Sequence, residues 1–182
     1  ALIFGLFFIA FAVKLPLWPV HSWLPDAHTD APTAVSVMLA GVLLKMAGYG
    51  LLRINLGFFQ ETQGFTIHDV AGLMAIIAAI SVIYGGIVTV RQTDMKRLIA
   101  YSSVSHMGFV MLGLSAVGSS AVDTSAAGLN GAALKMFTHG TITGLAFWMV
   151  GLPYDRTHTQ QLPHLGGLWK KMPLIAIFFL IP

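Results

Sequence analysis

Long apolar stretches, interrupted by few ionisable side chains, recur along the chain. A helix needs about 20 residues to cross a hydrocarbon core roughly 30 Å thick, and most of these stretches reach that length. The pattern predicts spans at residues 1–20, 31–55, 69–90, 98–118, 125–152 and 172–182. We therefore expect an all-α fold, a polytopic transmembrane helix bundle. Because the sequence starts inside one apolar run and stops inside another, we also expect a single internal fragment of a longer transmembrane domain.

The composition agrees with lipid as the main solvent of this chain. Hydrophobic residues make up 56% of the sequence and charged residues only 9%, whereas about a quarter of an average soluble domain is charged. The net charge of +3 is scattered, so nothing here predicts a nucleic-acid partner. The absence of cysteine excludes disulfides, thiolate metal sites and thiol nucleophiles from this stretch.

Proline positions divide the chain. None occurs between Pro32 and Pro153, so the middle spans are predicted to run as unbroken helices. Four crowd the stretch after the first apolar run, namely Pro16, Pro19, Pro25 and Pro32. We expect the helix to break soon after Lys14, with the open backbone buried in protein or beside water. In the alternative, Lys14 lies at the membrane edge and Pro16 only starts a loop.

Several predicted spans carry a titratable side chain near the middle. Lys45 lies about four residues, or about 6 Å, from the centre of its span, and His106 lies within about one turn of the centre of its own. Lys135 and His139 share one helix face, because they are four residues apart. A charge at this depth costs about 2.5–3.5 kcal/mol on insertion scales. The sequence therefore predicts a row of ionisable groups at one depth.

The chemistry of these side chains suits protons. Burial destabilises the charged form of lysine and histidine, so a neighbouring charge can load or unload them. Histidine can also pass a proton between its two ring nitrogens. The alternative is a structural scaffold, in which the lysines pair locally and each histidine is a hydrogen-bonded packing residue.

A metal site is one other interpretation of the polar residues. His21 and His28, with Asp26 and Asp30, lie in the sequence HSWLPDAHTDAP. This segment contains prolines and lacks the helical spacing of metal-binding histidines, so we expect a solvated or folded-back loop and no metal.

A membrane-embedded hydrolase is a further alternative. Ser102 or Ser103 could act as a nucleophile with His106 as its base. No nucleophile-elbow or oxyanion-hole motif accompanies them, which disfavours this chemistry.

Three blocks of the sequence resemble a known family. Residues 14–53 read KLPLWPVHSWLPDAHTDAPTAVSVMLAGVLLKMAGYGLLR and residues 91–113 read RQTDMKRLIAYSSVSHMGFVMLG. Both are similar to the antiporter-like membrane subunits of proton-pumping NADH:quinone oxidoreductase, respiratory complex I. The third block, residues 136–159, reads MFTHGTITGLAFWMVGLPYDRTHT and resembles the M-type branch, the relatives of mitochondrial subunit four. The first two blocks are shared with multisubunit sodium/proton antiporters and membrane-bound hydrogenases.

The resemblance implies a bundle of about fourteen helices in two inverted repeats, each with a proline-broken helix. This chain would cover roughly helices seven to twelve. Lys14 would be the lysine of the broken helix, paired with a glutamate outside this sequence, and Lys45 the bridging lysine of the next helix. His106 and His139 would continue the relay. Lys135 departs from the family pattern, in which a neutral residue is usual, and is either an extra relay site or paired locally.

The resemblance also implies the function and the partners. We expect proton translocation across an energy-transducing membrane, such as the bacterial plasma membrane, and no redox chemistry in this chain. Quinone, FMN and iron–sulfur clusters would belong to partner subunits, since no cofactor motif occurs here. Expected partners are other membrane subunits of the complex and lipid. The alternative is a subunit of a sodium/proton antiporter or of a membrane-bound hydrogenase.

Overall fold

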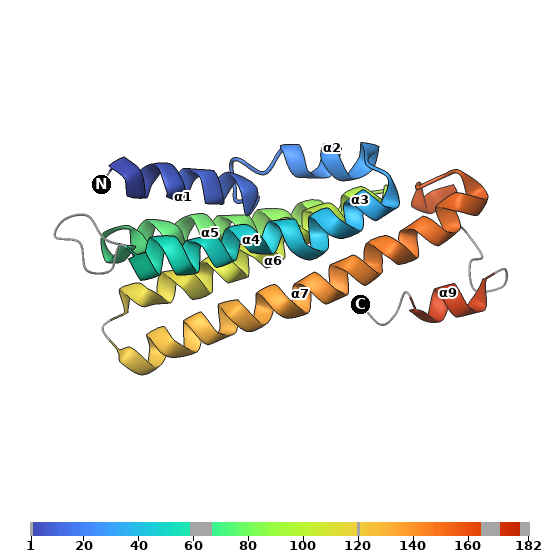
Figure 1. Cartoon of the computed structure of the whole chain (residues 1–182). Helices are drawn as coiled ribbons and strands as arrows, with labels where there is room; N and C mark the ends of the chain where they lie inside the picture. The colour runs from blue at the N-terminus through green and yellow to red at the C-terminus, as the bar shows by residue number, and fades with distance from the viewer. Residues whose placement is uncertain (1, 59–66, 120, 165–171, 179–182) are drawn as a thin grey trace.

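The computed structural model describes residues 2–58, 67–119, 121–164 and 172–178, and these residues form a bundle of roughly aligned helices (Figure 1). α1 (Leu2–Lys14) ends where the prolines predicted a break. The indole N–H of Trp23 donates to the carbonyl of Val13 at 3.0 Å, which satisfies one free carbonyl at this helix end. Within the first predicted span, residues 1–20, the α-helix thus covers Leu2–Lys14.

The segment after the break corrects a sequence prediction. Residues 21–32 were expected to form a loop, but Trp23–Asp30 form a helix, α2. Pro25 lies in the first turn of α2, where a backbone N–H has no partner within the helix, so proline is tolerated there. α1 and α2 follow one another along the same side of the bundle (Figure 1).

The next helix is continuous but irregular. It consists of α3 (Thr33–Met38), the π-helical segment η1 (Leu39–Leu43), α4 (Leu44–Gly50) and a second π-helical segment, η2 (Leu51–Phe58). The helix is unbroken, as the absence of proline predicted, but its π-helical segments were not predicted. Such π segments place an extra residue in a turn and are frequent at functional sites.

The remaining helices complete the bundle. They are α5 (Ile67–Val90), α6 (Met95–Ser115) with the short 3₁₀ segment η3 (Ala116–Gly118), α7 (Val122–Thr157), the 3₁₀ turn η4 (Leu162–His164) and α9 (Pro173–Phe178). α7 extends beyond the predicted 125–152 and contains Pro153 in its last turns. Of the last predicted span, residues 179–182 lie outside the described part. Thr33–Gly57, His68–Val90 and Met95–Gly118 are long and apolar enough to cross a membrane.

Glycines allow the helices to approach closely at two crossings that matter for the site. A Cβ atom at Gly140 of α7 would lie 2.8 Å from the carbonyl oxygen of Gly41 in η1. A Cβ at Gly48 of α4 would meet the sulfur of Met136 and lie 3.5 Å from Leu15 Cδ1. Close packing through small residues is a usual way to associate helices in lipid, and here it holds α4 against α7.

Candidate functional site

Two histidines from neighbouring helices form the centre of the candidate site. The rings of His106 on α6 and His139 on α7 meet edge to face, with centroids 5.1 Å apart and planes at 61°. His139 is 2% exposed. Both of its ring nitrogens, and Nδ1 of His106, find no hydrogen-bond partner among the described residues. Histidine can bind and release a proton through either ring nitrogen near neutral pH.

Thr143 lies one turn after His139 and bonds the backbone of that residue. Its hydroxyl donates to the carbonyl of His139 at 2.5 Å, one turn away along α7. This hydroxyl therefore bonds the helix backbone and not the His139 ring, which has no partner among the described residues.

Lys45 approaches the histidine pair from α4. Its ammonium donates to the carbonyl of Ala40 in η1. Its stem packs beside Gly140, whose Cβ position lies 3.5 Å from Lys45 Cε. Lys45 acts electrostatically on both His106 and His139. The structure therefore brings three of the residues singled out by depth into one cluster, one from each of α4, α6 and α7.

A groove of about 850 Å³ exposes Lys45 to the outside of the described bundle. It runs between α3–α4 and α7, and Gly41, Gly140 and Gly144 contribute to its lining. Most of the groove surface is apolar. Among its described lining residues, Lys45 is the one basic side chain.

Lys135 lies one turn before His139 on α7 and is half-buried. It faces a second groove, of about 820 Å³, between α6 and α7, with Asp123 also in the lining. Lys135 acts electrostatically on both histidines. No hydrogen bond or ion pair joins its ammonium to a described residue.

Lys14 is half-buried at the last residue of α1. Its ammonium makes no hydrogen bond or ion pair with a described residue. Its neighbour Leu15 is buried and packs near Gly48, one turn beyond Lys45. The structure thus places the break of the first helix beside α4, while Lys14 itself stays apart from the histidine pair.

Sequence reasoning missed His28, which it assigned to a loop. His28 lies on α2, is 0% exposed and stacks on Phe147 of α7, with ring centroids 4.3 Å apart and planes at 14°. Neither ring nitrogen has a hydrogen-bond partner among the described residues. The first-turn position of Pro25 was the signal that could have identified α2 and its buried face.

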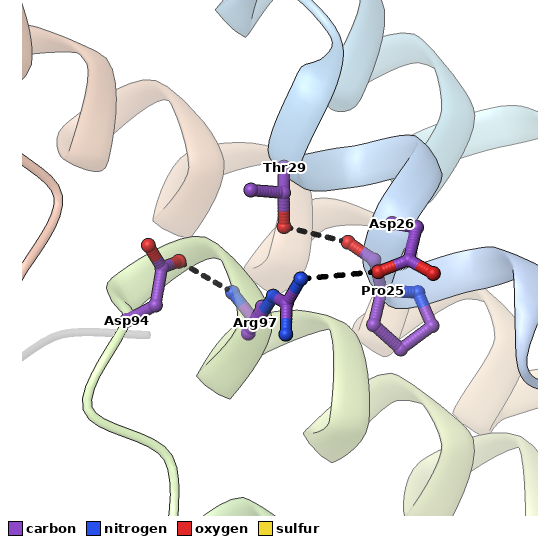
Figure 2. A network of polar contacts seen from close by, with 5 residues as sticks. All are labelled: Pro25, Asp26, Thr29, Asp94 and Arg97. Atoms are coloured by element: carbon purple, nitrogen blue, oxygen red, sulfur yellow. Dashed lines mark hydrogen bonds and ion pairs between the residues drawn. The ribbon is translucent and has the colours of Figure 1, made fainter.

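The polar side chains behind the metal and hydrolase interpretations include several that bond to other groups. Asp26 forms an ion pair with Arg97 of α6, with 3.1 Å between Nη2 and Oδ1 (Figure 2). The described residues include no group of three or more His, Cys, Asp or Glu side chains suited to a metal ion. The hydroxyls of Ser102 and Ser103 both donate to the carbonyl of Ile99, at 2.8 and 3.0 Å, so neither bonds His106.

Comparison with known proteins gives one family. The sequence matches the family described as NADH:quinone oxidoreductase/Mrp antiporter, TM, over residues 1–182. It is 47% identical to NADH-quinone oxidoreductase subunit M of Rhodobacter capsulatus over 179 residues, 98% of this chain and 33% of that protein. It is 46% identical to NAD(P)H-quinone oxidoreductase chain 4 1 of Synechococcus sp. (strain JA-3-3Ab) over 178 residues, 98% of this chain and 32% of that protein.

Solved structures give the same result. Respiratory complex I from Thermus thermophilus with bound NADH contains a chain that matches with a TM-score of 0.83 and 32% identity, over 98% of this chain and 37% of that chain. The Mrp complex from Dietzia sp. DQ12-45-1b contains one with a TM-score of 0.86 and 25% identity, over 99% of this chain and 32% of that chain. The predicted all-α, antiporter-like membrane bundle is confirmed. The chain spans about a third of the length of the relatives it matches.

Proposed function

Because this chain belongs to the NADH:quinone oxidoreductase/Mrp antiporter transmembrane family, we propose that it carries protons within the membrane along Lys45, His106 and His139. The observation that supports this role best is the contact between the two imidazoles, 5.1 Å between ring centroids, with Lys45 packed beside Gly140. A histidine pair at this separation can exchange a proton directly or through one intervening water.

Each member of the row has a distinct part in this mechanism. Lys45 holds or releases a proton, since an ammonium that bonds only a carbonyl has no carboxylate to keep it charged. His106 and His139 pass the proton between α6 and α7 through their unoccupied ring nitrogens. Lys14 lies at the break of the first helix, and Lys135 lies one turn from His139. The charges of these two lysines would change the electrostatic potential at the two ends of the row.

The relatives favour one assembly for this transport. We assign the chain to an M-type subunit of a proton-translocating NADH:quinone oxidoreductase, in keeping with its 47% identity to the Rhodobacter capsulatus subunit M. Other membrane subunits and lipid would be its neighbours. Quinone, FMN and iron–sulfur clusters would be held by partner subunits, and the residues of this chain would handle only protons.

A sodium/proton antiporter is the second candidate, and the structural match to the Dietzia Mrp complex favours it. The two functions differ in what drives the protons. Proton movement that requires NADH oxidation and no sodium supports the oxidoreductase subunit. Proton movement driven by a sodium gradient in the absence of NADH supports the antiporter.

Substitution of Lys45 tests the relay itself. In the full-length subunit within its assembled complex, Lys45→Ala removes the proton carrier, and Lys45→Arg keeps a positive charge that cannot be released. We expect both variants to lose proton transfer by about tenfold or more, measured as acidification of membrane vesicles. Arg91→Ala, an exposed substitution in the turn after α5, is the control and should pump normally.

The Arg variant separates the relay from a scaffold. If Lys45 only pairs with the Ala40 carbonyl, arginine retains the charge and the donor, and pumping should persist. Normal pumping by an assembled Lys45→Arg or Lys45→Ala complex would contradict the proposed relay.

A further inference from the structure

Three serines precede His106 on α6, and one of them bonds a different helix. The hydroxyls of Ser102 and Ser103 donate to a carbonyl of their own helix, as serine inside a helix commonly does. Ser105 instead donates to the carbonyl of Val82 in α5, at 2.9 Å. A carbonyl oxygen has a second lone pair for such a donor, so this bond can join α5 to α6 without opening either helix.

The backbones of α5 and α6 lie against each other at this bond. A Cβ atom at Gly85, which follows Val82 by one turn, would lie 2.6 Å from the backbone nitrogen of Ser105. A Cβ atom at Gly108, which follows Ser105 by one turn, would lie 3.0 Å from the backbone nitrogen of Val82. Close approach through glycine and hydrogen bonds from serine are two usual ways to associate helices in lipid. Both hold Ser105 against α5.

His106 follows Ser105 directly and meets a different helix. Consecutive residues lie about 100° apart around a helix axis. Ser105 can therefore bond α5 while the ring of His106 meets His139 of α7 edge to face. No described residue bonds Nδ1 of His106. The direction of this ring therefore depends on the rotation of α6 and not on a hydrogen bond at this nitrogen.

The crossing of α6 with α7 is built from glycines. A Cβ atom at Gly113 of α6 would lie 2.7 Å from the carbonyl oxygen of Gly128 in α7. A Cβ atom at Gly128 would lie 2.8 Å from the carbonyl oxygen of Gly113. These two residues allow the helices to come close, but they have no side chain that could bond across the crossing. The hydroxyl of Ser105 thus fixes α6 from the α5 side.

We infer that Ser105 is a positioning residue for proton transfer. Its bond to the Val82 carbonyl, at the crossing formed by Gly85, holds α6 at the rotation in which His106 faces His139. The inference rests on the proposed relay and adds to it a residue that carries no proton itself. Because Ser105 acts through His106, the loss of its hydroxyl should matter only while His106 carries the proton.

Two pairs of substitutions, made in the full-length subunit of the assembled complex, test this role. Ser105→Ala removes the bond to Val82. Ser103→Ala is its matched control, because it removes a buried hydroxyl of the same helix that donates within that helix. Gly85→Ala pushes the backbone of Ser105 away from α5. Gly72→Ala, also in α5, is the control for this variant, since no atom lies within 4 Å of its Cβ position.

The first measurement is the initial rate of vesicle acidification per NADH oxidised. We expect Ser105→Ala and Gly85→Ala to lower this rate about threefold or more, because a small displacement of a positioned group slows transfer steeply. Both controls should stay close to wild type. A wild-type rate in Ser105→Ala or in Gly85→Ala overturns the inference, and so does an equal loss in Ser103→Ala.

A double variant separates positioning from a general loss of stability. If Ser105 acts through His106, Ser105→Ala should cause no further loss in a His106→Gln complex, from which the imidazole is already absent. A destabilised complex would instead lose the same factor again, so a double loss equal to the product of the single losses overturns the inference. If His106→Gln and Lys45→Ala both pump like wild type, the relay itself fails. If these two variants lose pumping and Ser105→Ala does not, only the positioning role fails.

Discussion

Lys96 and Arg97 are adjacent in the sequence but lie in opposite environments. Lys96 is buried against the end of α2, where it bonds the Ala31 carbonyl. Arg97 pairs with Asp26 in the open, with 46% and 70% of the two side chains exposed. Exposed ion pairs contribute between zero and about 1 kcal/mol, whereas removing the buried, charged donor of a partly buried carbonyl costs about 1–3 kcal/mol. The hydrogen bond of Lys96 is therefore expected to stabilise the contact between α2 and α6 more than the Arg97–Asp26 ion pair does.

This difference predicts unequal effects of two neighbouring substitutions. Lys96→Met should destabilise the full-length subunit by about 1–3 kcal/mol, because the Ala31 carbonyl loses its donor. Arg97→Met should cost less than about 1 kcal/mol. Thermal unfolding of the two purified variants in the same detergent compares them directly. Equal shifts in Tm would show that Lys96 does not stabilise the contact between α2 and α6 more than Arg97 does.

The titratable residues show what the sequence could and could not predict. Lys45, His106 and His139 could be chosen from their depth alone, because the rise per residue of a helix is fixed. Their contact with one another depends on how the helices rotate and cross, and no single-sequence pattern gives that. His28 was missed for a local reason. The prolines around it were interpreted as a loop, although Pro25 occupies the one helical turn that tolerates proline.

At the scale of helices, the crossing of α7 with the α3–α4 helix sets the distance from Lys45 to His139. The close approach of Gly41 and Gly140 brings the two backbones together, and a Cβ at Gly140 would lie 2.8 Å from the Gly41 oxygen. That oxygen belongs to the backbone and cannot rotate away. The π segment η1, which contains Gly41, was not predicted, because no residue pattern in the sequence indicates it.

Gly140→Ala should therefore separate the two helices and weaken proton transfer. The added methyl group displaces α7 from Gly41 and moves His139 away from Lys45, which lengthens the proton path. Gly131→Ala on the same helix is the matched control, since no atom lies within 4 Å of its Cβ position. This control should leave transfer unchanged and stabilise the helix by up to about 1 kcal/mol. Vesicle acidification and thermal unfolding of both variants measure the two effects, and equal pumping would contradict a role for this crossing.

At the scale of the whole molecule, exposed apolar side chains and buried histidines are distributed as expected for a protein in lipid. On α5, Leu73, Ile76, Ile83 and Ile87 recur at helical spacing with between 57% and 64% of each exposed. On α7, by contrast, His139 is buried against α6. Apolar side chains of α5 thus face outward, whereas His139 faces His106, in keeping with the cost of exposing titratable groups to lipid. Composition predicted the apolar exterior, and only the packed structure assigns the residues that meet inside.

A row that crosses several helices has a kinetic signature that belongs to the molecule as a whole. If His106 and His139 act in series, replacing either with Gln already makes one proton-transfer step rate-limiting for pumping. The double variant should then pump at nearly the rate of the slower single variant. Independent effects would instead combine as free energies, so two tenfold losses would give about a hundredfold loss. Acidification rates of the wild type, both single variants and the double variant form the cycle. A double loss equal to the product of the single losses would contradict one shared path through the pair.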